Sequence, residues 1–234
     1  MKCAIMQPTY LPWCGYFNLI HSVDKFIFLD DVKLEKSNWQ VRNRIKSANG
    51  ELMLSLSVNL PHGRMNTMIN QAQLDFTRTC KVKHLKSIYT NYRKSPYFEQ
   101  IFPFIEAQIL SSHSQLSHFT IDIIKSIAKE LHIDTEFYLA SEISHSDKVK
   151  DERLVEICNQ VGANEYISPI GAANYIEKTS PGGAIAKNGI TLTYQKFPHP
   201  VYPQLYGEFI SHLSMIDMLF NCGFYQSSKL IKQK

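Results

Sequence analysis

The aromatic segment MQPTYLPWCGYF, residues 6–17, holds the side chains with the most evident chemistry near the start of the chain. Its two prolines stiffen the backbone, and Tyr10, Trp13 and Tyr16 supply large rings. Tyr10 and Trp13 could stack on a flat ring or on the face of a sugar. The alternative is that the three rings pack in the core. The segment therefore predicts either a binding loop or a rigid packing element.

Two carboxylates, Asp30 and Asp31, follow the second apolar run of the chain. A carboxylate at the end of a strand can hold a hydroxyl, an amine or a cation, or it can cap the next turn. Neighbouring strand residues point to opposite faces, so only one of the two faces a given ligand. We expect Asp31 to face the ligand and to act as a general base, and Asp30 to act as a cap. No third oxygen ligand is evident, so we assign no metal.

Three cations alternate along one predicted strand, at Arg42, Arg44 and Lys46. Such a row can clamp a diphosphate, because an arginine offers a planar fork to phosphate oxygens. The alternative is a solvated edge strand whose charges prevent aggregation. Asn43 points to the opposite face and would orient polar groups.

Polar residues also recur on one face of the predicted last helix, residues 209–221. Ser214, Asp217 and Asn221 fall within an arc of about 60° at helical spacing. They form either an internal network or one wall of a site, and we favour the wall. On an earlier predicted helix, His84 could act as a general base because its ordinary pKa is close to neutral. The alternative there is a structural histidine.

A βαβ unit must position the first of these residues. Residues 3–6 and 26–29 are short apolar runs that predict buried strands, and residues 16–23 show helical spacing between them. Such a unit implies parallel strands. Ligands of an open parallel sheet bind beyond the carboxyl ends of the strands. We therefore expect Gln7 and the Asp30-Asp31 pair at the same edge of the sheet.

The remainder of the chain predicts a hairpin, a helical middle and further alternation of strands and helices. The hairpin pairs residues 41–45 with 52–58 around Asn49-Gly50. Helices are predicted at 82–92, 98–110, 116–131, 153–161 and 209–221, and strands at 137–140, 166–167 and 190–194. We predict an α/β fold, with a Rossmann-like parallel sheet that begins with the βαβ unit. The chain forms a single domain, 1–234, with a helical insertion at roughly 80–132.

The composition is that of a globular protein, with 44% hydrophobic and 20% charged residues among 234. The net charge of +4 suits an anionic small molecule, and no basic run predicts a nucleic-acid partner. Neither a signal peptide nor a membrane span is evident, so we expect a cytoplasmic protein. The five cysteines are scattered without a C-x-x-C pair, which predicts buried thiols rather than a zinc site or disulfides.

The order of these motifs resembles the WbqC-like family of bacterial proteins. The resemblance rests on MQPTYLPWCGYFNLIHSVDKFIFLDDV followed by NWQVRNRIK, with support from KHLKSIYTNYRKSPYF, RLVEICNQVGANEYISPIGAANYI and FPHPVYPQLYGEFISHLSMIDMLFNCG. These blocks lie in order and cover almost the whole chain. Cys14 stands where the family is expected to have an aliphatic residue, which argues against Cys14 as a nucleophile.

The family is associated with gene clusters for O-antigen and other surface polysaccharides. The resemblance implies a place in the synthesis of such polysaccharides. From this and from the residue chemistry we predict a transferase that modifies a nucleotide-linked amino sugar by acyl or aminoacyl transfer, with Asp31 or His84 as the proton acceptor. The matched residues expected to bind the substrate are Gln7, Tyr10, Trp13, Tyr16, Asp30, Arg42, Asn43, Arg44, Ser168, Tyr175, Gln204, Ser214, Asp217 and Asn221. The expected partners are a sugar nucleotide and an acyl or aminoacyl donor. The sequence identifies no cofactor and no oligomeric state.

Two alternatives stay open at this point. The first strand, its loop and the following helix look like the start of HIGH-motif nucleotidyltransferases, although Trp13-Cys14-Gly15-Tyr16 replaces their histidine pair. The other alternative is a non-catalytic protein that binds sugar nucleotides or assists a partner transferase. Release of pyrophosphate separates the first alternative from acyl transfer, and turnover separates both enzymes from the binding protein.

Overall fold

The computed structural model describes residues 1–35, 38–63, 65–75, 81–143, 147–178 and 180–233. These residues form two compact units. The sheet unit consists of residues 1–7, 18–31 and 134–198, and the helical unit consists of residues 8–17, 32–133 and 199–234. The prediction of a single domain stays a prediction. Within the described ranges, no helix combines the length and the apolar character that crossing a membrane requires.

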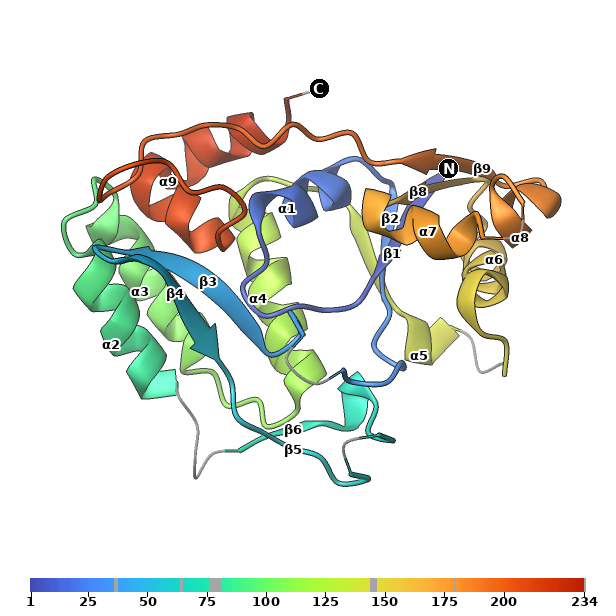
Figure 1. The fold of residues 1–234 in the computed structure, drawn as a ribbon, viewed down its shortest axis with the longest axis horizontal. Coiled ribbons are helices and arrows are strands. Elements are labelled where there is room, and N and C mark those ends of the chain that lie inside the picture. Colours follow the sequence, from blue (N-terminus) through green and yellow to red (C-terminus); the bar gives the residue numbers. More distant parts are fainter. Residues whose placement is uncertain (36–37, 64, 76–80, 144–146, 179, 234) are drawn as a thin grey trace. The chain divides into compact units, whose positions relative to one another are not determined.

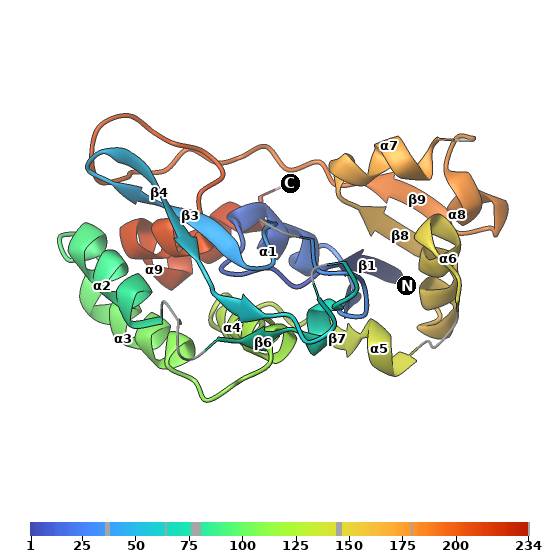
Figure 2. The ribbon, with the colours of Figure 1, turned by 60° about the horizontal axis from the view of Figure 1, so that its bottom comes forward.

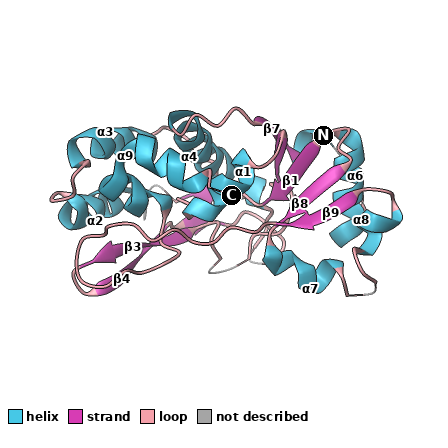
Figure 3. Cartoon of the chain, turned by 90° about the horizontal axis from the view of Figure 1, so that it is seen from above, coloured by secondary structure: helices cyan, strands magenta, loops and turns pink. Residues whose placement is uncertain are grey.

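A five-stranded parallel sheet forms the centre of the sheet unit, in the order β7-β2-β1-β8-β9 (Figures 1 and 3). The strands are β1 (Lys2–Met6), β2 (Lys25–Phe28), β7 (Glu136–Leu139), β8 (Glu165–Ser168) and β9 (Thr191–Tyr194). Cys3 pairs with Lys25 and Met6 pairs with Phe28, in parallel register. The chain joins β1 to β2 through α1 (Cys14–His21). The predicted α/β fold with an initial βαβ unit is confirmed.

Helices pack on this sheet through a buried apolar cluster. The unit contains α5 (Ala140–Ile143), α6 (Lys150–Gln160), η2 (Ile170–Ala172), α7 (Ala173–Ile176) and α8 (Gly183–Lys187). Figure 2 shows α6 and α8 beside β8 and β9. Ile157 and Ile185 of these helices lie in one cluster with Cys3, Ile27 and Tyr166 of the strands. Removal of such side chains from water is the main stabilising contribution to the unit.

The helical unit combines a hairpin with four long helices. The hairpin strands are β3 (Arg42–Ser47) and β4 (Gly50–Ser55), and two further short strands are β5 (Val58–Asn59) and β6 (Gln73–Leu74). The helices are α2 (Lys81–Tyr92), α3 (Phe98–Ile109), α4 (Leu116–Glu130) and α9 (Met215–Ile231), with a short η1 (Ile69–Gln71). The hairpin register pairs Ser47 with Gly50, whose φ of 100° allows the tight turn. Figures 1 and 2 show α2, α3 and α9 grouped beside this hairpin.

The last helix differs most from its prediction. It begins at Met215 rather than at residue 209, because the Ser214 side chain accepts a hydrogen bond from the Ile216 N–H and so caps the helix there. The predicted end near 221 lies just before a kink, beyond which a second helical segment continues to Ile231. Gly223, with φ 68° and ψ 173°, has non-helical dihedral angles and separates the two segments of α9. The interruption proves to be part of a pocket.

Candidate functional site

In the sheet unit, Asp30 holds the start of α5. Its carboxylate is buried and accepts two hydrogen bonds from Ser141, one from the N–H at 3.1 Å and one from the hydroxyl at 2.7 Å. Ser141 lies in the first turn of α5, where a carboxylate also interacts favourably with the helix dipole. The side chain of Asp30 is thus used within the protein.

The neighbouring Asp31 has one carboxylate oxygen still available. Its Oδ2 accepts a hydrogen bond from Arg153 Nη2 at 2.7 Å, and that ion pair is largely shielded from water. Its Oδ1 is buried and has no hydrogen-bond partner among the residues that the structure describes. A buried acceptor without a donor is costly. Asp31 therefore carries an acceptor that a substrate proton or hydroxyl could satisfy.

The ends of β1 and β8 form the topological switch point of the sheet. On one side of β1 lie β2 and then β7, and on its other side lie β8 and then β9. The order of the strands along the chain therefore reverses its direction between β1 and β8. Gln7 directly follows β1, and Ser168 ends β8 with its side chain buried. Crevices at such a point are the usual ligand sites of open α/β sheets. The side chain of Tyr175 lies outside the described residues.

In the helical unit, Asn43 anchors the aromatic loop to β3. Its Nδ2 donates to the Tyr10 carbonyl at 3.1 Å and to the Leu11 carbonyl at 2.7 Å, and its Oδ1 accepts from the Arg44 N–H at 2.8 Å. Leu11 has a φ of 46°, which a branched residue rarely adopts, so the loop needs this support. The Met215 N–H donates to the Pro12 carbonyl at 2.8 Å and joins the loop to α9. Asn43 thus orients polar backbone groups.

His84 is a buried, neutral histidine. Its Nε2 lies 3.2 Å from the Ser55 carbonyl, which only accepts, so Nε2 carries the proton. Its Nδ1 consequently accepts from the Tyr10 hydroxyl at 2.9 Å. Burial lowers the pKa of His84 to about 4, against the opposing effect of the Ser55 carbonyl. Both ring nitrogens are engaged, and the role of His84 as a proton acceptor stays a prediction.

The other rings of the loop pack inside the unit. Tyr10 and Tyr16 are buried, and burial raises the pKa of Tyr16 well above its ordinary value. The indole of Trp13 stacks on His199 at 5.8 Å between centroids and lies 4.9 Å from the ring of His212. A Cβ on Gly15 would lie 2.1 Å from an atom of this indole, so only glycine permits the packing. Stacking of a ligand by Tyr10 or Trp13 stays a prediction.

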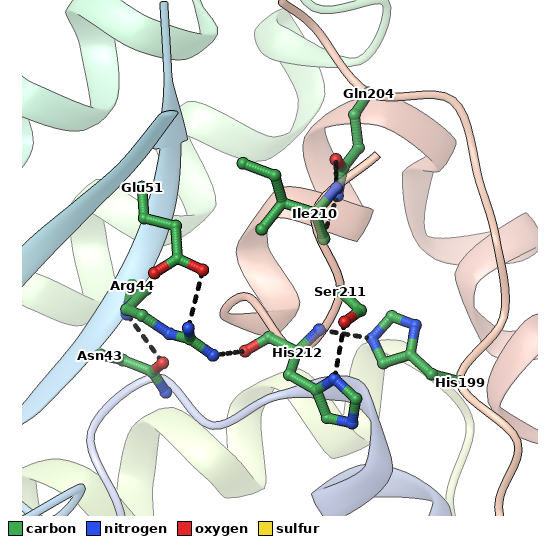
Figure 4. Close-up of polar contacts among 8 residues, drawn as sticks. All are labelled: Asn43, Arg44, Glu51, His199, Gln204, Ile210, Ser211 and His212. Atoms are coloured by element: carbon green, nitrogen blue, oxygen red, sulfur yellow. Dashed lines mark hydrogen bonds and ion pairs between the residues drawn. The ribbon is translucent and has the colours of Figure 1, made fainter. Parts of the chain in front are cut away.

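The three cations of the predicted basic row, Arg42, Arg44 and Lys46, have different partners in the structure. The Arg44 guanidinium donates to Glu51 Oε1 at 2.7 Å and to the His212 carbonyl at 3.1 Å, and Figure 4 shows it between these two acceptors. Lys46 is buried, and its Nζ donates to Gln204 Oε1 at 3.1 Å and to the Glu208 carbonyl. Figure 4 also shows the amide of Gln204 beside the backbone of Ile210. Two of the three cations are thus engaged within the protein.

Asp217 of α9 is the centre of a buried network. The Tyr92 hydroxyl donates to its Oδ1 at 2.7 Å, and the Tyr202 hydroxyl and Gln204 Nε2 donate to its Oδ2 at 2.9 and 2.8 Å. Burial raises the pKa of Asp217, while these three donors favour the charged carboxylate and act in the opposite direction. The polar stripe of α9 thus forms an internal network. Its second predicted role, as a wall of a site, stays a prediction.

Arg42 differs from Arg44 and Lys46 because no group of the described chain engages its guanidinium in an ion pair. The indole of Trp39 is 44% exposed, and the Cζ atoms of Arg42 and Arg44 lie 5.8 and 5.6 Å from its centroid. Among the described residues Arg42 has no carboxylate partner, whereas Arg44 pairs with Glu51. The Nε atoms of both arginines are buried without an acceptor. Trp39 lies in the NWQVRNRIK block of the family resemblance but is not among the site residues predicted from the sequence. Its position three residues before Arg42 and five before Arg44 was the available signal.

The comparisons with known proteins agree with the predicted family. The model of the WbqC-like protein family matches residues 7–229. An uncharacterized protein of Mycobacterium tuberculosis, Rv1507c, is 32% identical over 224 residues, which cover 95% of this chain and 94% of that protein. No solved structure matches.

Proposed function

The chain belongs to the WbqC-like protein family, and we propose that it is a transferase that acts on a nucleotide-linked amino sugar. The association of that family with surface-polysaccharide gene clusters supports this class of substrate. In the proposed reaction, the sugar amine attacks the acyl or aminoacyl carbonyl carbon and forms an amide bond. The bond from that carbon to the donor's leaving group breaks, and a base accepts the proton of the amine.

The observation that carries the proposal is the guanidinium of Arg42, which has no carboxylate partner among the described residues, beside the exposed indole of Trp39. A nucleotide combines a flat ring system with a diphosphate. The indole offers a stacking face for the ring, and the guanidinium offers paired donors to phosphate oxygens. Arg44 supplies a second positive charge near the same ring, although Glu51 partly neutralises it. This surface therefore suits a nucleotide better than it suits a neutral ligand.

Asp31 is the better candidate for the proton acceptor. Its Oδ1 has no donor among the described residues, whereas both nitrogens of His84 already have partners. Arg153 holds the other oxygen of Asp31 and fixes the direction of the carboxylate. Proton acceptance by a positioned carboxylate typically contributes about 10²–10⁴ in rate.

Titration calorimetry with UDP-N-acetylglucosamine, dTDP-glucose and UDP tests the nucleotide site. A charge-assisted bond to phosphate contributes about 1.5–3 kcal/mol, so Arg42→Ala should weaken binding about tenfold or more. Trp39→Leu should weaken it as well, since stacking is lost. Arg93→Ala removes an exposed arginine just after α2 and is the matched control. Equal affinities of wild type, Arg42→Ala and Trp39→Leu would exclude this surface as the nucleotide site.

A non-catalytic sugar-nucleotide binding protein is the second candidate. The observation in its favour is that the buried polar groups His84 and Asp217 have their ring nitrogens and carboxylate oxygens fully engaged. Mass spectrometry of an amino-sugar nucleotide incubated with acyl and aminoacyl thioesters separates the candidates. A new amide identifies the transferase, released pyrophosphate identifies a nucleotidyltransferase, and binding without either product identifies the binding protein.

A further inference from the structure

The interruption of α9 opens a pocket in the helical unit. Its volume is about 580 Å³, and its lining comes from the start of α3, from the loop before α9 and from both sides of Gly223. Figures 1 and 2 show α3 and α9 side by side. Trp39 and Arg42 are not part of the lining. The pocket is thus separate from the proposed nucleotide surface.

Gly223 holds one aromatic ring in the wall of this pocket. The Tyr97 N–H donates to the Phe220 carbonyl at 3.2 Å, which ties the start of α3 to α9. A Cβ on Gly223 would lie 2.7 Å from two atoms of the Tyr97 ring, so the ring rests directly on the glycine. Tyr225 supplies a second ring and is 74% exposed. Two tyrosines thus present accessible rings at one pocket.

Three carboxamides line the same pocket, from Gln100, Asn221 and Gln226. Asn221 is only 7% exposed, and its Nδ2 donates to the Asp217 carbonyl at 2.7 Å. Its Oδ1 receives no hydrogen bond from any group that the structure describes. This oxygen remains accessible to solvent at the pocket, so a ligand hydroxyl can replace water as its donor.

The lining is also electrically neutral. None of the nine lining residues has a charged side chain. Burial, and next the negative charge of Asp217, raise the pKa of the Cys222 thiol to about 11, so this group is protonated at neutral pH. Lys229 lies against the Tyr225 ring, with its Nζ 4.3 Å from the centroid, but it is not one of the lining residues. A phosphate finds no cation in the lining, and an alkyl chain would leave Asn221 Oδ1 unpaired.

We propose that this pocket binds a neutral saccharide. The C–H face of a sugar packs on a tyrosine ring, and its hydroxyls exchange hydrogen bonds with carboxamides, which both donate and accept. The volume lies within the range of about 300–1,000 Å³ that is usual for small-molecule sites. The inference goes beyond the proposed function, because it requires neither a nucleotide nor a transfer reaction.

Saturation-transfer NMR of the full chain with glucose, galactose, rhamnose, N-acetylglucosamine and lactose at millimolar concentration tests the pocket. At least one of these saccharides should bind, and Tyr225→Ala should weaken its affinity about tenfold, a typical loss for one stacking contact with its desolvation. The single variant Gln226→Ala should also weaken the affinity for that saccharide. Both side chains are exposed, so the fold should be retained. Gln160→Ala, an exposed glutamine of α6, is the matched control and should bind like wild type.

Three results would overturn the inference. The first is that none of the five saccharides binds. The second is that one binds equally well to wild type, Tyr225→Ala and Gln226→Ala. The third is that glucuronate binds more tightly than glucose, because a charged ligand would contradict the neutral lining. Arg42→Ala should leave saccharide binding unchanged, so failure of this inference and failure of the nucleotide site are distinguishable.

Discussion

At the scale of single residues, Asp30 and Asp31 show how neighbours with the same chemistry acquire different partners. Asp30 accepts two hydrogen bonds from Ser141 at the start of α5. Asp31 pairs with Arg153 through one oxygen and keeps the other without a donor in the described part of the chain. Both residues lie beyond the end of β2 at Phe28, so their partners follow from the path of the loop after the strand rather than from strand alternation.

We expect Asp31→Asn to keep the fold and the affinity for sugar nucleotide while lowering turnover by about 10²–10⁴, because a carboxamide cannot accept the proton of the amine. Asp30→Asn should instead cost about 0.5–2 kcal/mol of stability, as the loss of a helix cap does. Calorimetric unfolding and steady-state rates of both variants check this pair. An inactive but stable Asp30→Asn, with an active but unstable Asp31→Asn, would reverse the assignment.

Because the pKa of His84 is lowered in the folded protein, we expect the stability of the protein to depend on pH. Its pKa is about 4 in the folded protein against 6.5 for an ordinary histidine, so the unfolded chain binds the additional proton between these values. The contribution of His84 to the free energy of unfolding is therefore fully present above about pH 6.5. The free energy of unfolding should fall by about 1–2 kcal/mol on acidification to about pH 5. Denaturant unfolding of wild type and His84→Gln at both pH values measures the difference. Exposed His62→Gln should behave like wild type, and a wild-type decrease no larger than that of His84→Gln would contradict the neutral buried ring.

At the scale of elements, the interruption of α9 is the feature that the helical periodicity did not indicate. Gly223 separates two helical segments at a kink, and helical spacing placed the end of the helix near 221 without indicating that a second segment follows. The interruption depends on the ring of Tyr97, which lies where a Cβ would be. A contact between an element and a residue more than a hundred positions away leaves no local signal.

Gly223→Ala should lower the free energy of unfolding by about 1–3 kcal/mol, because a φ of 68° strains any residue with a Cβ and the added methyl overlaps the Tyr97 ring. Gly171→Ala is the matched control, since nothing lies within 4 Å of its added Cβ and its φ is not in the left-handed region. That control should change stability by less than about 0.5 kcal/mol. Chemical denaturation of both variants measures the effect, and similar values for the two would argue against a strained interruption.

At the scale of the whole molecule, the chain carries a net charge of +4, which favours anionic ligands at low ionic strength. The proposed nucleotide surface has cations, while the lining of the α9 pocket has none. The two proposed ligands should therefore respond differently to salt.

Affinity for UDP-N-acetylglucosamine should fall as NaCl rises from about 0.05 to 0.5 M, because exposed charges are increasingly screened over this range. Affinity for a neutral saccharide should change little over the same range, since no charge is neutralised on binding. Calorimetric titrations at both salt concentrations measure the two slopes. Equal slopes for the two ligands would contradict the assignment of one charged and one neutral site.

Much of the fold could be predicted from the sequence. Local periodicity was sufficient for the initial βαβ unit, for the hairpin around Asn49-Gly50 and for the helices of the middle region, because a buried strand or helix face repeats its apolar residues at a fixed spacing. Asn43, Arg42 and the two aspartates were also recognised as candidates from their residue types and positions.

Only the tertiary structure decided which side chain each of these residues meets. Tyr92 donates to Asp217 across 125 positions, and His84 accepts from Tyr10 across 74. Arg44 and Arg42 share one strand, yet Arg44 has Glu51 as its partner and Arg42 has no carboxylate partner among the described residues. Spacing along the chain determines which face a residue occupies, because the backbone repeats regularly. The partner on that face depends on how distant segments pack, and this packing is a property of the whole folded chain.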